Sequence, residues 1–491
     1  MEYEQVIGLE VHAQLLTRSK MFCSCSANYF DAPPNTLVCP VCLGMPGVLP
    51  VINRRAVEFT IMTGLALHCT IARETKFDRK NYPYPDLMKG YQISQFDQPI
   101  SGAGWLSIQA DGVEKRAGIT RVHLEEDVAK LSHHHPSDEE SYSLLDVNRA
   151  GVPLMEVVGD PDLRSPEEAR QYLTRLRSIL QYLGVSTGNM QDGSFRCDAN
   201  ICVRPQGETR LFPKVEVKNM NSFRAVYRAL EYEFVRQVEV VSHGGTIPQE
   251  TRGWVEERGV TVSQRSKEHA HDYRYFPEPD LPPLVIEPAW VEEIRSRLPE
   301  LPEARRDRLV EQYGLPLYDA SLLTASKGTA DFFEQAVHVR PLREEALGAR
   351  AKAMSNWMLG EMARLLHAED RDTSDVPLTP QALADLQDMV DAGTLSISMA
   401  KAAFEEMFLT GKALEAIVRE RGLVQVSDAD ALGPLVEEVL AGNPQAVKDY
   451  QKGKETAVKF LVGQVMKRSQ GKANPSLTQD LLAARLKTMK E

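Results

Sequence analysis

The chain lacks any long apolar run: none approaches the 18 or so residues that a membrane-spanning helix requires. Its first residues, Met-Glu-Tyr-Glu-Gln, are acidic where a secretion signal would be basic. With 491 residues, 43% hydrophobic and 26% charged, the composition is that of a soluble globular protein. We therefore expect a cytoplasmic protein that does not bind membranes, with roughly three domains.

Several common functional motifs are absent as well. The sequence contains no G-x-x-x-x-G-K-[ST] phosphate loop, no G-x-G-x-x-G dinucleotide motif and no H-E-x-x-H zinc-protease motif. If the protein uses ATP, it must hold the phosphates through metal ions and scattered basic side chains rather than through a glycine-rich loop.

Basic residues are too few to give the whole molecule a positive field. Lys and Arg number 57 against 69 Asp and Glu, a formal net charge of −12. Residues 448–491 nevertheless carry +6, which leaves −18 on residues 1–447. We predict a helical tail with a basic face, and a merely solvated surface is the alternative. The basic residues assigned to this face are Lys459, Lys467, Arg468 and Lys472.

Cysteine is scarce, but its distribution is uneven. The chain has seven cysteines, an odd number that does not favour a disulfide framework. Cys23-x-Cys25 and Cys39-x-x-Cys42 are separated by 13 residues. This spacing is typical of a closed, tetrahedral zinc site with four thiolates and a structural role, and unmetallated reduced thiols are the alternative.

The first 290 residues predict mainly strands, because apolar and polar residues alternate with period two. The strand segments are 4–15, 118–130, 143–158, 196–204 and 214–219. Ser165 and Ser222 each precede a helical apolar pattern. We predict an α+β fold: a cradle-like domain around an extended, mostly antiparallel sheet, followed by helical domains. Prolines crowd between residues 275 and 301, and helical patterns dominate beyond them. The predicted domains span residues 1–293, 294–410 and 411–491.

Alternation in the strands also predicts a polar face. In each strand the apolar residues would enter the core. The polar residues alternate with them, so the polar side chains would project together from the other face. These polar sets are Glu10 and His12; His123, Glu125 and Asp127; Arg196, Asp198 and Asn200; and Lys214, Glu216 and Lys218. Carboxylates with one or two imidazoles suit Mg²⁺ or Mn²⁺, and a solvated face with cross-strand ion pairs is the alternative.

Residues 80–92 combine lysines, tyrosines, prolines and glycine, a composition typical of a functional loop rather than of a core element. The basic and aromatic members are Lys80, Tyr82, Tyr84, Lys89 and Tyr91.

Five blocks of sequence resemble the B subunit of the glutamine-dependent aspartyl/glutamyl-tRNA amidotransferases. They are residues 8–15 (GLEVHAQL), 80–95, 124–127 (LEED), 146–149 (DVNR) and 271–280 (HDYRYFPEPD). The resemblance extends over essentially the whole chain. It implies a subunit that uses ATP to phosphorylate the side-chain carboxylate of Glu on tRNA(Gln) or Asp on tRNA(Asn), after which ammonia displaces the phosphate to leave the amide.

The resemblance also implies residue roles. Glu10, His12 and Glu125 would hold Mg²⁺, and Asp198 and Glu216 would bind a second ion or lie in the outer shell. Lys80, Lys89 and Arg149 would contact phosphate or the tRNA 3′ end, and Tyr82, Tyr84 and Tyr91 would shape the acceptor pocket. The basic tail would contact the tRNA body.

The implied partners are an amidase A subunit, which hydrolyses glutamine and supplies ammonia through a protected channel, and a small C subunit. Misacylated tRNA(Gln) or tRNA(Asn) is the implied substrate, and the matching aminoacyl-tRNA synthetase is a further candidate partner. Two other function classes stay open: a tRNA-binding adaptor without catalysis, and a stand-alone metal-dependent hydrolase. An adaptor would tolerate loss of Glu125, whereas the metal-dependent transferase would not.

Overall fold

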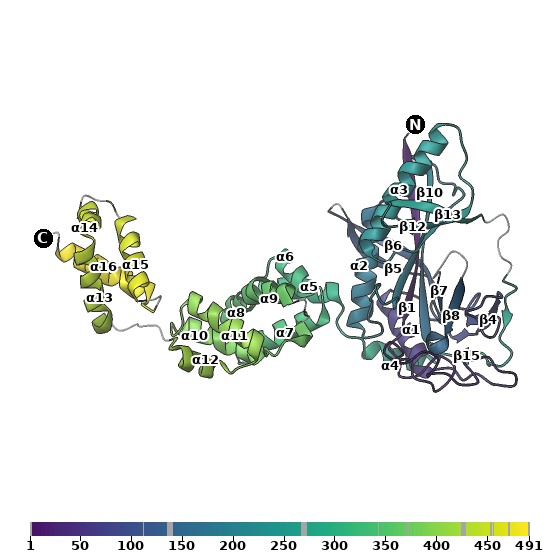
Figure 1. The fold of residues 1–491 in the computed structure, drawn as a ribbon, viewed down its shortest axis with the longest axis horizontal. Helices are drawn as coiled ribbons and strands as arrows, with labels where there is room; N and C mark the ends of the chain where they lie inside the picture. The colour runs from purple at the N-terminus through teal and green to yellow at the C-terminus, as the bar shows by residue number, and fades with distance from the viewer. Residues whose placement is uncertain are drawn as a thin grey trace. The chain divides into compact units, whose positions relative to one another are not determined.

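In a computed structural model, the chain forms two compact units, residues 1–301 and 302–491 (Figure 1). The structure describes residues 2–110, 112–134, 141–266, 273–341, 343–369, 371, 373–423, 429–451, 454, 456–469 and 472–489. His271 and Asp272, the first residues of the HDYRYFPEPD block, lie outside the described residues. Within the described part of the chain, no helix is both long and apolar enough to cross a membrane.

An eight-stranded sheet with the order β13-β12-β11-β10-β1-β9-β6-β5 forms the first unit (Figure 1). Its strands are β1 (Tyr3–Gln14), β5 (Gly104–Ala110), β6 (Val113–Glu126), β9 (Pro153–Gly159), β10 (Phe195–Pro205), β11 (Val215–Lys218), β12 (Glu250–Val255) and β13 (Val260–Ser266). Only the β11–β12 pairing among these described strands is parallel. The α+β fold with a mostly antiparallel sheet is therefore confirmed.

Three helices cover one face of this sheet: α1 (Arg54–Ala66), α2 (Pro166–Tyr182) and α3 (Phe223–Ser242) (Figure 1). The alternation in β1 explains the arrangement, because Leu9 and Val11 are buried in the core while Glu10 and His12 between them are only partly buried. The apolar side chains of each strand are buried against the helices. The opposite face of the sheet can therefore carry polar side chains.

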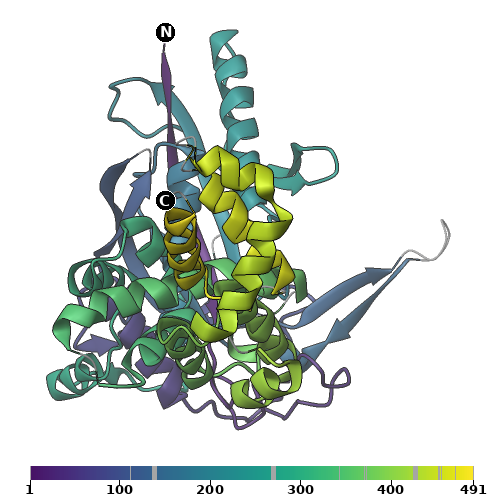
Figure 2. The same ribbon diagram turned by 90° about the vertical axis from the view of Figure 1, so that its left-hand side faces the viewer.

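Three smaller sheets complete the first unit. β14 (Phe276–Pro277), β3 (Asp78–Asn81) and β4 (Tyr91–Ser94) form one, and β15 (Leu284–Val285) pairs with β2 (Glu74–Thr75). β7 (Lys130–His134) and β8 (Tyr142–Asp146) form a ribbon that projects from the unit (Figure 2). The single strand expected over 143–158 is therefore wrong: the chain leaves β8, makes a short 3₁₀ turn at Val147–Arg149 and enters β9 of the large sheet.

The predicted helix starts are confirmed. The Ser165 hydroxyl accepts a hydrogen bond from the Glu168 N–H at the start of α2, and Ser222 does the same for Ala225 in α3. The proline-rich stretch contains one helix, α4 (Pro288–Ser296), whose first residue is a proline. Ile294 on α4 packs in the core of the first unit, so this stretch belongs to that unit as far as Leu301.

The second unit is helical and has two separate apolar cores. The first core involves α5 (Pro302–Tyr313), α6 (Leu317–Leu323), α7 (Lys327–His338), α8 (Glu344–Trp357), a π-helical turn (Met358–Met362), α9 (Ala363–Glu369), a 3₁₀ turn (Thr373–Asp375), α10 (Pro380–Asp391), α11 (Ile397–Thr410) and α12 (Leu414–Arg421). The second involves α13 (Ala429–Gly442), α14 (Pro444–Gln451), α15 (Thr456–Arg468) and α16 (Pro475–Thr488). Two cores agree with a division of this region, but the predicted boundaries at 293 and 410 stay predictions.

Replacement of Phe404 by alanine is expected to destabilise the first of these cores by about 3–5 kcal/mol, because the change leaves a cavity that the packed core cannot refill. Phe404 is fully buried and stacks on Trp357, with ring centroids 5.4 Å apart. Phe460→Ala is the matched control: its side chain is 52% exposed, so we expect a change within about 0.5 kcal/mol. Urea denaturation measures both, and equal losses would contradict the assigned core.

Candidate active site and metal sites

A cavity of about 450 Å³ opens on the polar face of the large sheet. The strand register explains which side chains meet there: Glu10 pairs with Asp198, and His12 lies between Arg196 on β10 and Glu156 on β9. β6 lies on the other side of β9 and brings His123 opposite Glu156. Tyrosines, glutamines and a lysine from outside the large sheet complete the lining.

A partly buried imidazole and two buried carboxylates form the centre of this cavity. His12 Nε2 lies 3.7 Å from Glu125 Oε1 and 3.5 Å from Glu156 Oε2. The ligand atoms of the three residues all lie within 4.8 Å of one another. Oxygen-rich donors with one imidazole suit a hard divalent cation, so this set fits Mg²⁺ or Mn²⁺.

Neighbouring charges shift the pKa values of His12 and Glu156 in this group. Burial opposes the charged form of His12, but Glu156, Glu125 and Asp198 outweigh it and raise the pKa of the imidazole to about 9. Burial likewise opposes ionisation of Glu156, but His123 and His12 hold the pKa of its carboxyl well below the ordinary value. Glu156 is therefore held as a carboxylate, and a divalent cation that binds His12 must displace the proton of the imidazolium.

Polar neighbours fix the orientation of these ligands. Glu125, 3% exposed, accepts a hydrogen bond from the Ser94 hydroxyl at 3.1 Å. His123 Nε2 lies 3.1 Å from Glu156 Oε2. Such outer contacts hold ligand side chains in place before a cation binds.

The other predicted acidic residues line the same cavity but outside this group. Glu10 accepts a hydrogen bond from Asn200 Nδ2 at 2.8 Å. Asp198 and Glu216 both form ion pairs with Lys218, whose Nζ is 3.1 Å from Glu216 Oε1. The Lys218 ammonium thus lies between the two carboxylates that were candidates for a second ion.

The residues of the 80–92 segment divide between several places. Lys80 and Tyr82 line the cavity, and the Lys80 Nζ lies 5.1 Å from the ring centroid of Tyr273 and 5.6 Å from that of Tyr82. Burial opposes the charged form of Lys80, but Glu125 and nearby side chains raise its pKa above the ordinary value. Tyr84 is exposed at the surface.

Lys89, Tyr91 and Arg149 do not line the main cavity. Lys89 and Tyr91 border a separate small pocket beside the cysteines, and Lys89 Nζ forms an ion pair with Glu126 at 2.5 Å. Arg149 donates to the carbonyls of Val128 and Ala129 at 2.8 and 2.9 Å. Its guanidinium therefore ties down the segment that follows β6.

Sequence reasoning missed Glu156, one of the three clustered ligands. The signal that could have found it is a single carboxylate within the apolar strand β9, of the same parity as Leu154 on the cavity side. Arg196 and Lys218 were expected on the polar face but without a role, and Tyr273 and Tyr275 were identified only as part of the 271–280 block.

Residues 184–188 also match the G-x-S-x-G pattern. This motif marks a hydrolase nucleophile only where a strand turns into a helix. Here it follows α2 and precedes β10, and the buried Ser186 accepts a hydrogen bond from the Gly188 N–H. The match is a local turn and not a nucleophile elbow.

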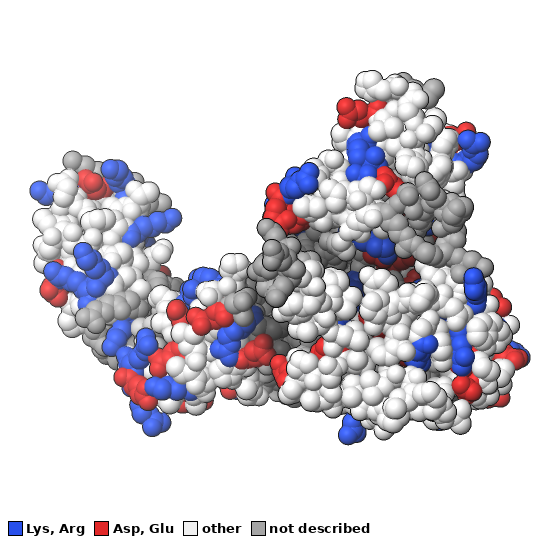
Figure 3. Space-filling model, turned by 45° about the vertical axis from the view of Figure 1, so that its right-hand side comes forward, with Lys and Arg blue, Asp and Glu red and all other residues white. Residues whose placement is uncertain are grey.

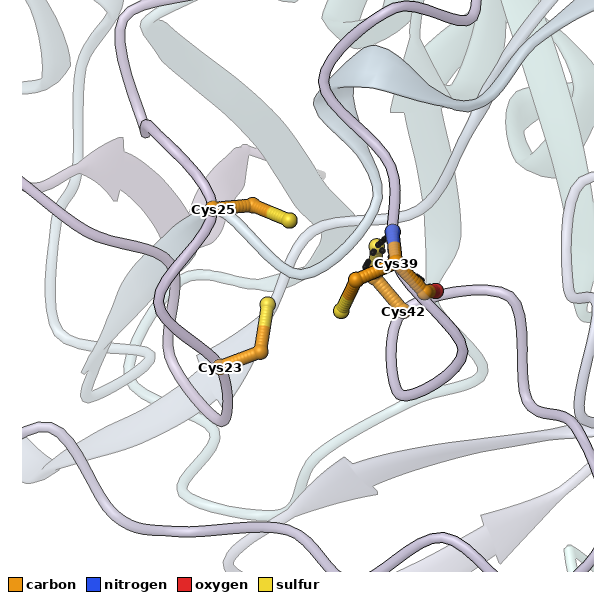
Figure 4. Close-up of side chains that lie close together, drawn as sticks. All are labelled: Cys23, Cys25, Cys39 and Cys42. Atoms are coloured by element: carbon orange, nitrogen blue, oxygen red, sulfur yellow. Dashed lines mark hydrogen bonds between the residues drawn. The ribbon is translucent and has the colours of Figure 1, made fainter.

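The four clustered cysteines converge, as Figure 4 shows. Their sulfur atoms all lie within 4.8 Å of one another, so Cys23 and Cys25 meet Cys39 and Cys42 from the other side of the loop. A hydrogen bond with Cys23, together with the N–H of Cys39, lowers the pKa of the Cys42 thiol below its ordinary value. Four sulfur donors without another ligand type fit a closed structural zinc site.

Three of the four tail residues lie on α15, and the fourth lies in the connection between α15 and α16. Lys459, Lys467 and Arg468 are exposed on α15, where Val458, Leu461 and Val465 are buried in the core. Lys472 is partly buried before α16. Arg468 forms an ion pair with Glu438. In Figure 3, the lobe that contains these helices shows more Lys and Arg than Asp and Glu on the face in view.

Known proteins match the chain over nearly its full length. The family model described as GatB/GatE catalytic domain matches residues 5–292, and the model described as GatB domain matches residues 331–486.

Three relatives are each named as the B subunit of an aspartyl/glutamyl-tRNA(Asn/Gln) amidotransferase. The protein of Dehalococcoides mccartyi (strain CBDB1) is 58% identical over 483 residues, which cover 98% of each chain. That of Moorella thermoacetica is 57% identical over 486 residues, covering 99% of this chain and 100% of the relative. That of Carboxydothermus hydrogenoformans is 53% identical over 486 residues, covering 99% of each. The chain belongs to the family of aspartyl/glutamyl-tRNA(Asn/Gln) amidotransferase B subunits.

Proposed function

We propose that this chain activates the side-chain carboxylate of Glu-tRNA(Gln), Asp-tRNA(Asn) or both by ATP-dependent phosphorylation and lets ammonia convert it to the amide. The observation that carries the proposal is the cavity in which the His12, Glu125 and Glu156 group lies beside Lys80, Arg196 and Lys218. Anionic ligands for a cation next to basic side chains suit a substrate that combines phosphates with a carboxylate.

The chemistry consists of two displacements. A side-chain carboxylate oxygen attacks the γ-phosphorus of ATP, the bond to the β,γ-bridging oxygen breaks, and ADP leaves with the electron pair. Ammonia then attacks the carbonyl carbon of the acyl phosphate, phosphate leaves with its electron pair, and the nitrogen loses a proton. Phosphorylation is required because an unmodified carboxylate has no adequate leaving group.

His12, Glu125 and Glu156 would hold Mg²⁺ or Mn²⁺, with Glu10 beside them. A bound divalent cation would neutralise phosphate charge at this position. For Asp198 and Glu216 the outer-shell role fits better than a second ion, because both carboxylates already hold Lys218.

The chain's own basic and aromatic side chains would position the two reactants. Lys80, on β3 outside the large sheet, would contact a phosphate, and Tyr82 would border the aminoacyl end of the tRNA. Lys89, Tyr84, Tyr91 and Arg149 lie outside the cavity lining. Their direct contact with ATP or the tRNA 3′ end would require a rearrangement on binding.

The same proposal includes the partners. Ammonia would come from an amidase A subunit through an enclosed path, since free ammonia is largely protonated at neutral pH and would be lost to solvent. A small C subunit would complete the complex, and the matching aminoacyl-tRNA synthetase is a further candidate partner. A cytoplasmic location follows from a tRNA substrate used in protein synthesis.

We propose that Cys23, Cys25, Cys39 and Cys42 hold a structural zinc ion. The convergence of four sulfur donors on two segments of one loop supports this role, because an ion there would tie residues 23–25 to residues 39–42.

Loss of Lys459 and Lys467 together is expected to weaken tRNA binding and to reduce the salt dependence of log Kd by up to about 2, since each phosphate contact contributes slightly less than 1 to that slope. Filter binding at several salt concentrations measures both quantities. The matched control replaces Lys352 and Lys401, which form ion pairs with Asp319 and Glu361. An equal effect in the control would indicate a change in net charge and not a tail contact.

The test of the function is conversion of Glu-tRNA(Gln) and Asp-tRNA(Asn) to their amides by this chain with its A and C partners, ATP, Mg²⁺ and ammonium in place of glutamine. We expect ATP-dependent amide formation, and the preferred tRNA identifies the substrate. Amide formation without ATP, or hydrolysis of the aminoacyl bond without amide, would overturn the proposal.

A further inference from the structure

Lys20 is a fully buried cation, 0% exposed, and the proposed reaction does not use it. Its Nζ donates a hydrogen bond to the carbonyl oxygen of Leu37 at 2.8 Å. Among the residues that the structure describes, no Asp or Glu forms an ion pair with it. A buried ammonium with only a neutral partner is costly, because the carbonyl dipole does not replace the lost hydration.

Lys20 lies next to the four clustered cysteines. The backbone N–H of Lys20 donates to the carbonyl of Cys25 at 2.9 Å, and Leu37, which accepts from its side chain, is two residues before Cys39. Lys20 therefore contacts both segments that carry the four cysteines. Gly151 lies between Lys20 and Cys42, the fourth cysteine of the cluster. A Cβ built at Gly151 would lie 3.5 Å from Lys20 Cδ and 3.7 Å from Cys42 Cβ.

The charge of the cysteine cluster complements that of the lysine. Four thiolates around one Zn²⁺ carry two net negative charges, and burial makes such an excess unfavourable without a nearby cation. Besides hydrogen bonding with Cys23 and with the Cys39 N–H, the positive charge of Lys20 favours the thiolate of Cys42. The positive charge of Lys20 would therefore offset part of the net negative charge of the zinc–thiolate cluster, and the cluster would stabilise the buried ammonium.

We propose that Lys20 is the counter-charge of the zinc–thiolate cluster, a positioning residue that strengthens zinc binding through electrostatics and not merely through its hydrogen bond to Leu37. The inference rests on the proposed zinc site and is independent of the amidation chemistry. It predicts that the lysine and the metal stabilise each other.

The experiment measures the zinc affinity of the full-length chain, in complex with its A and C partners, by competition with a chromogenic chelator. Lys20→Met removes the charge, and Lys20→Gln removes the charge but keeps an N–H donor. We expect both to weaken zinc binding about 10–100-fold, the range typical of lost outer contacts at metal sites. Lys401→Met, at an exposed site on the helical unit, should leave it unchanged.

A second comparison separates charge from packing. In a Cys39→Ser, Cys42→Ser background, which cannot hold the ion, Lys20→Met should leave Tm unchanged or raise it, since an unpaired buried cation is replaced by an apolar side chain. In the zinc-loaded chain the same change should lower Tm.

Each alternative result is distinguishable. Wild-type affinity in Lys20→Gln, or an equal loss of Tm in both backgrounds, would overturn the counter-charge role in favour of a structural hydrogen bond. If the wild-type complex contains no zinc, the zinc proposal itself fails and the Lys20 role fails with it. Zinc affinity and Tm are measured independently of amidation activity. Failure of the proposed amidation reaction would therefore not affect the test of the Lys20 role.

Discussion

Glu125→Gln is expected to lower the rate of ATP-dependent amide formation by about 10³-fold, because the change removes a negative charge from the group that would hold the divalent cation. The amide retains an oxygen that can accept the hydrogen bond from Ser94, so the local structure should persist. The measurement is single-turnover conversion of aminoacyl-tRNA with ammonium as nitrogen donor, together with tRNA affinity and complex assembly for the same variant.

Glu292→Gln is the matched control for this variant. Glu292 lies on α4 in the same unit, its side chain is 73% exposed and it does not line the cavity, so activity should stay at the wild-type level. Full activity of Glu125→Gln would mean that activation occurs elsewhere and that the chain is a tRNA-binding adaptor. Failure to assemble would instead assign Glu125 a structural role.

Cys39→Ser is expected to release the zinc ion and to lower the apparent Tm of the chain on the order of 10 °C, because structural zinc contributes its binding free energy directly to folding. Elemental analysis gives the zinc content and differential scanning calorimetry gives Tm. We expect one zinc ion per wild-type chain, which the four converging sulfur atoms of the cluster can hold, and none in the variant.

Cys69→Ala serves as the comparison, since Cys69 is a free, buried cysteine outside the cluster. It should keep the zinc ion and lose only the small stability of a truncated core side chain. A wild-type chain without zinc, or a Cys39→Ser chain with unchanged zinc content and Tm, would contradict the proposed metal site.

Local chemistry made much of the fold predictable. Ser165 and Ser222 identified the starts of α2 and α3 because a side-chain oxygen must accept from the first free N–H groups of a helix. The period-two alternation assigned Glu10 and His12 to the polar face, because successive side chains of a strand point to opposite faces whichever strands it pairs with. The proline-rich stretch was harder, because a proline at a helix start permits α4 where prolines generally indicate irregular chain.

The identity of neighbouring strands could not be predicted in the same way. β9 lies between β1 and β6, so Glu156 enters the site through a pairing between residues far apart in the chain. Arg149 was expected to contact substrate because it is a basic residue in a functional-looking segment. In the structure its guanidinium donates hydrogen bonds to backbone carbonyls instead. Residue type and spacing indicate what a side chain could bind, but only the tertiary structure determines which partner it meets.

Positional isotope exchange in ATP tests the central claim most directly. The complex is incubated with Mg²⁺, misacylated tRNA and ATP labelled with ¹⁸O at the β,γ-bridging oxygen, without any ammonia donor. If the chain transfers the γ-phosphoryl group reversibly to the side-chain carboxylate, the label exchanges into non-bridging positions of the β-phosphate, and only when the misacylated tRNA is present. Amide formation from a misacylated tRNA whose side-chain carboxylate carries ¹⁸O, without transfer of ¹⁸O into the released phosphate, would contradict an acyl phosphate intermediate.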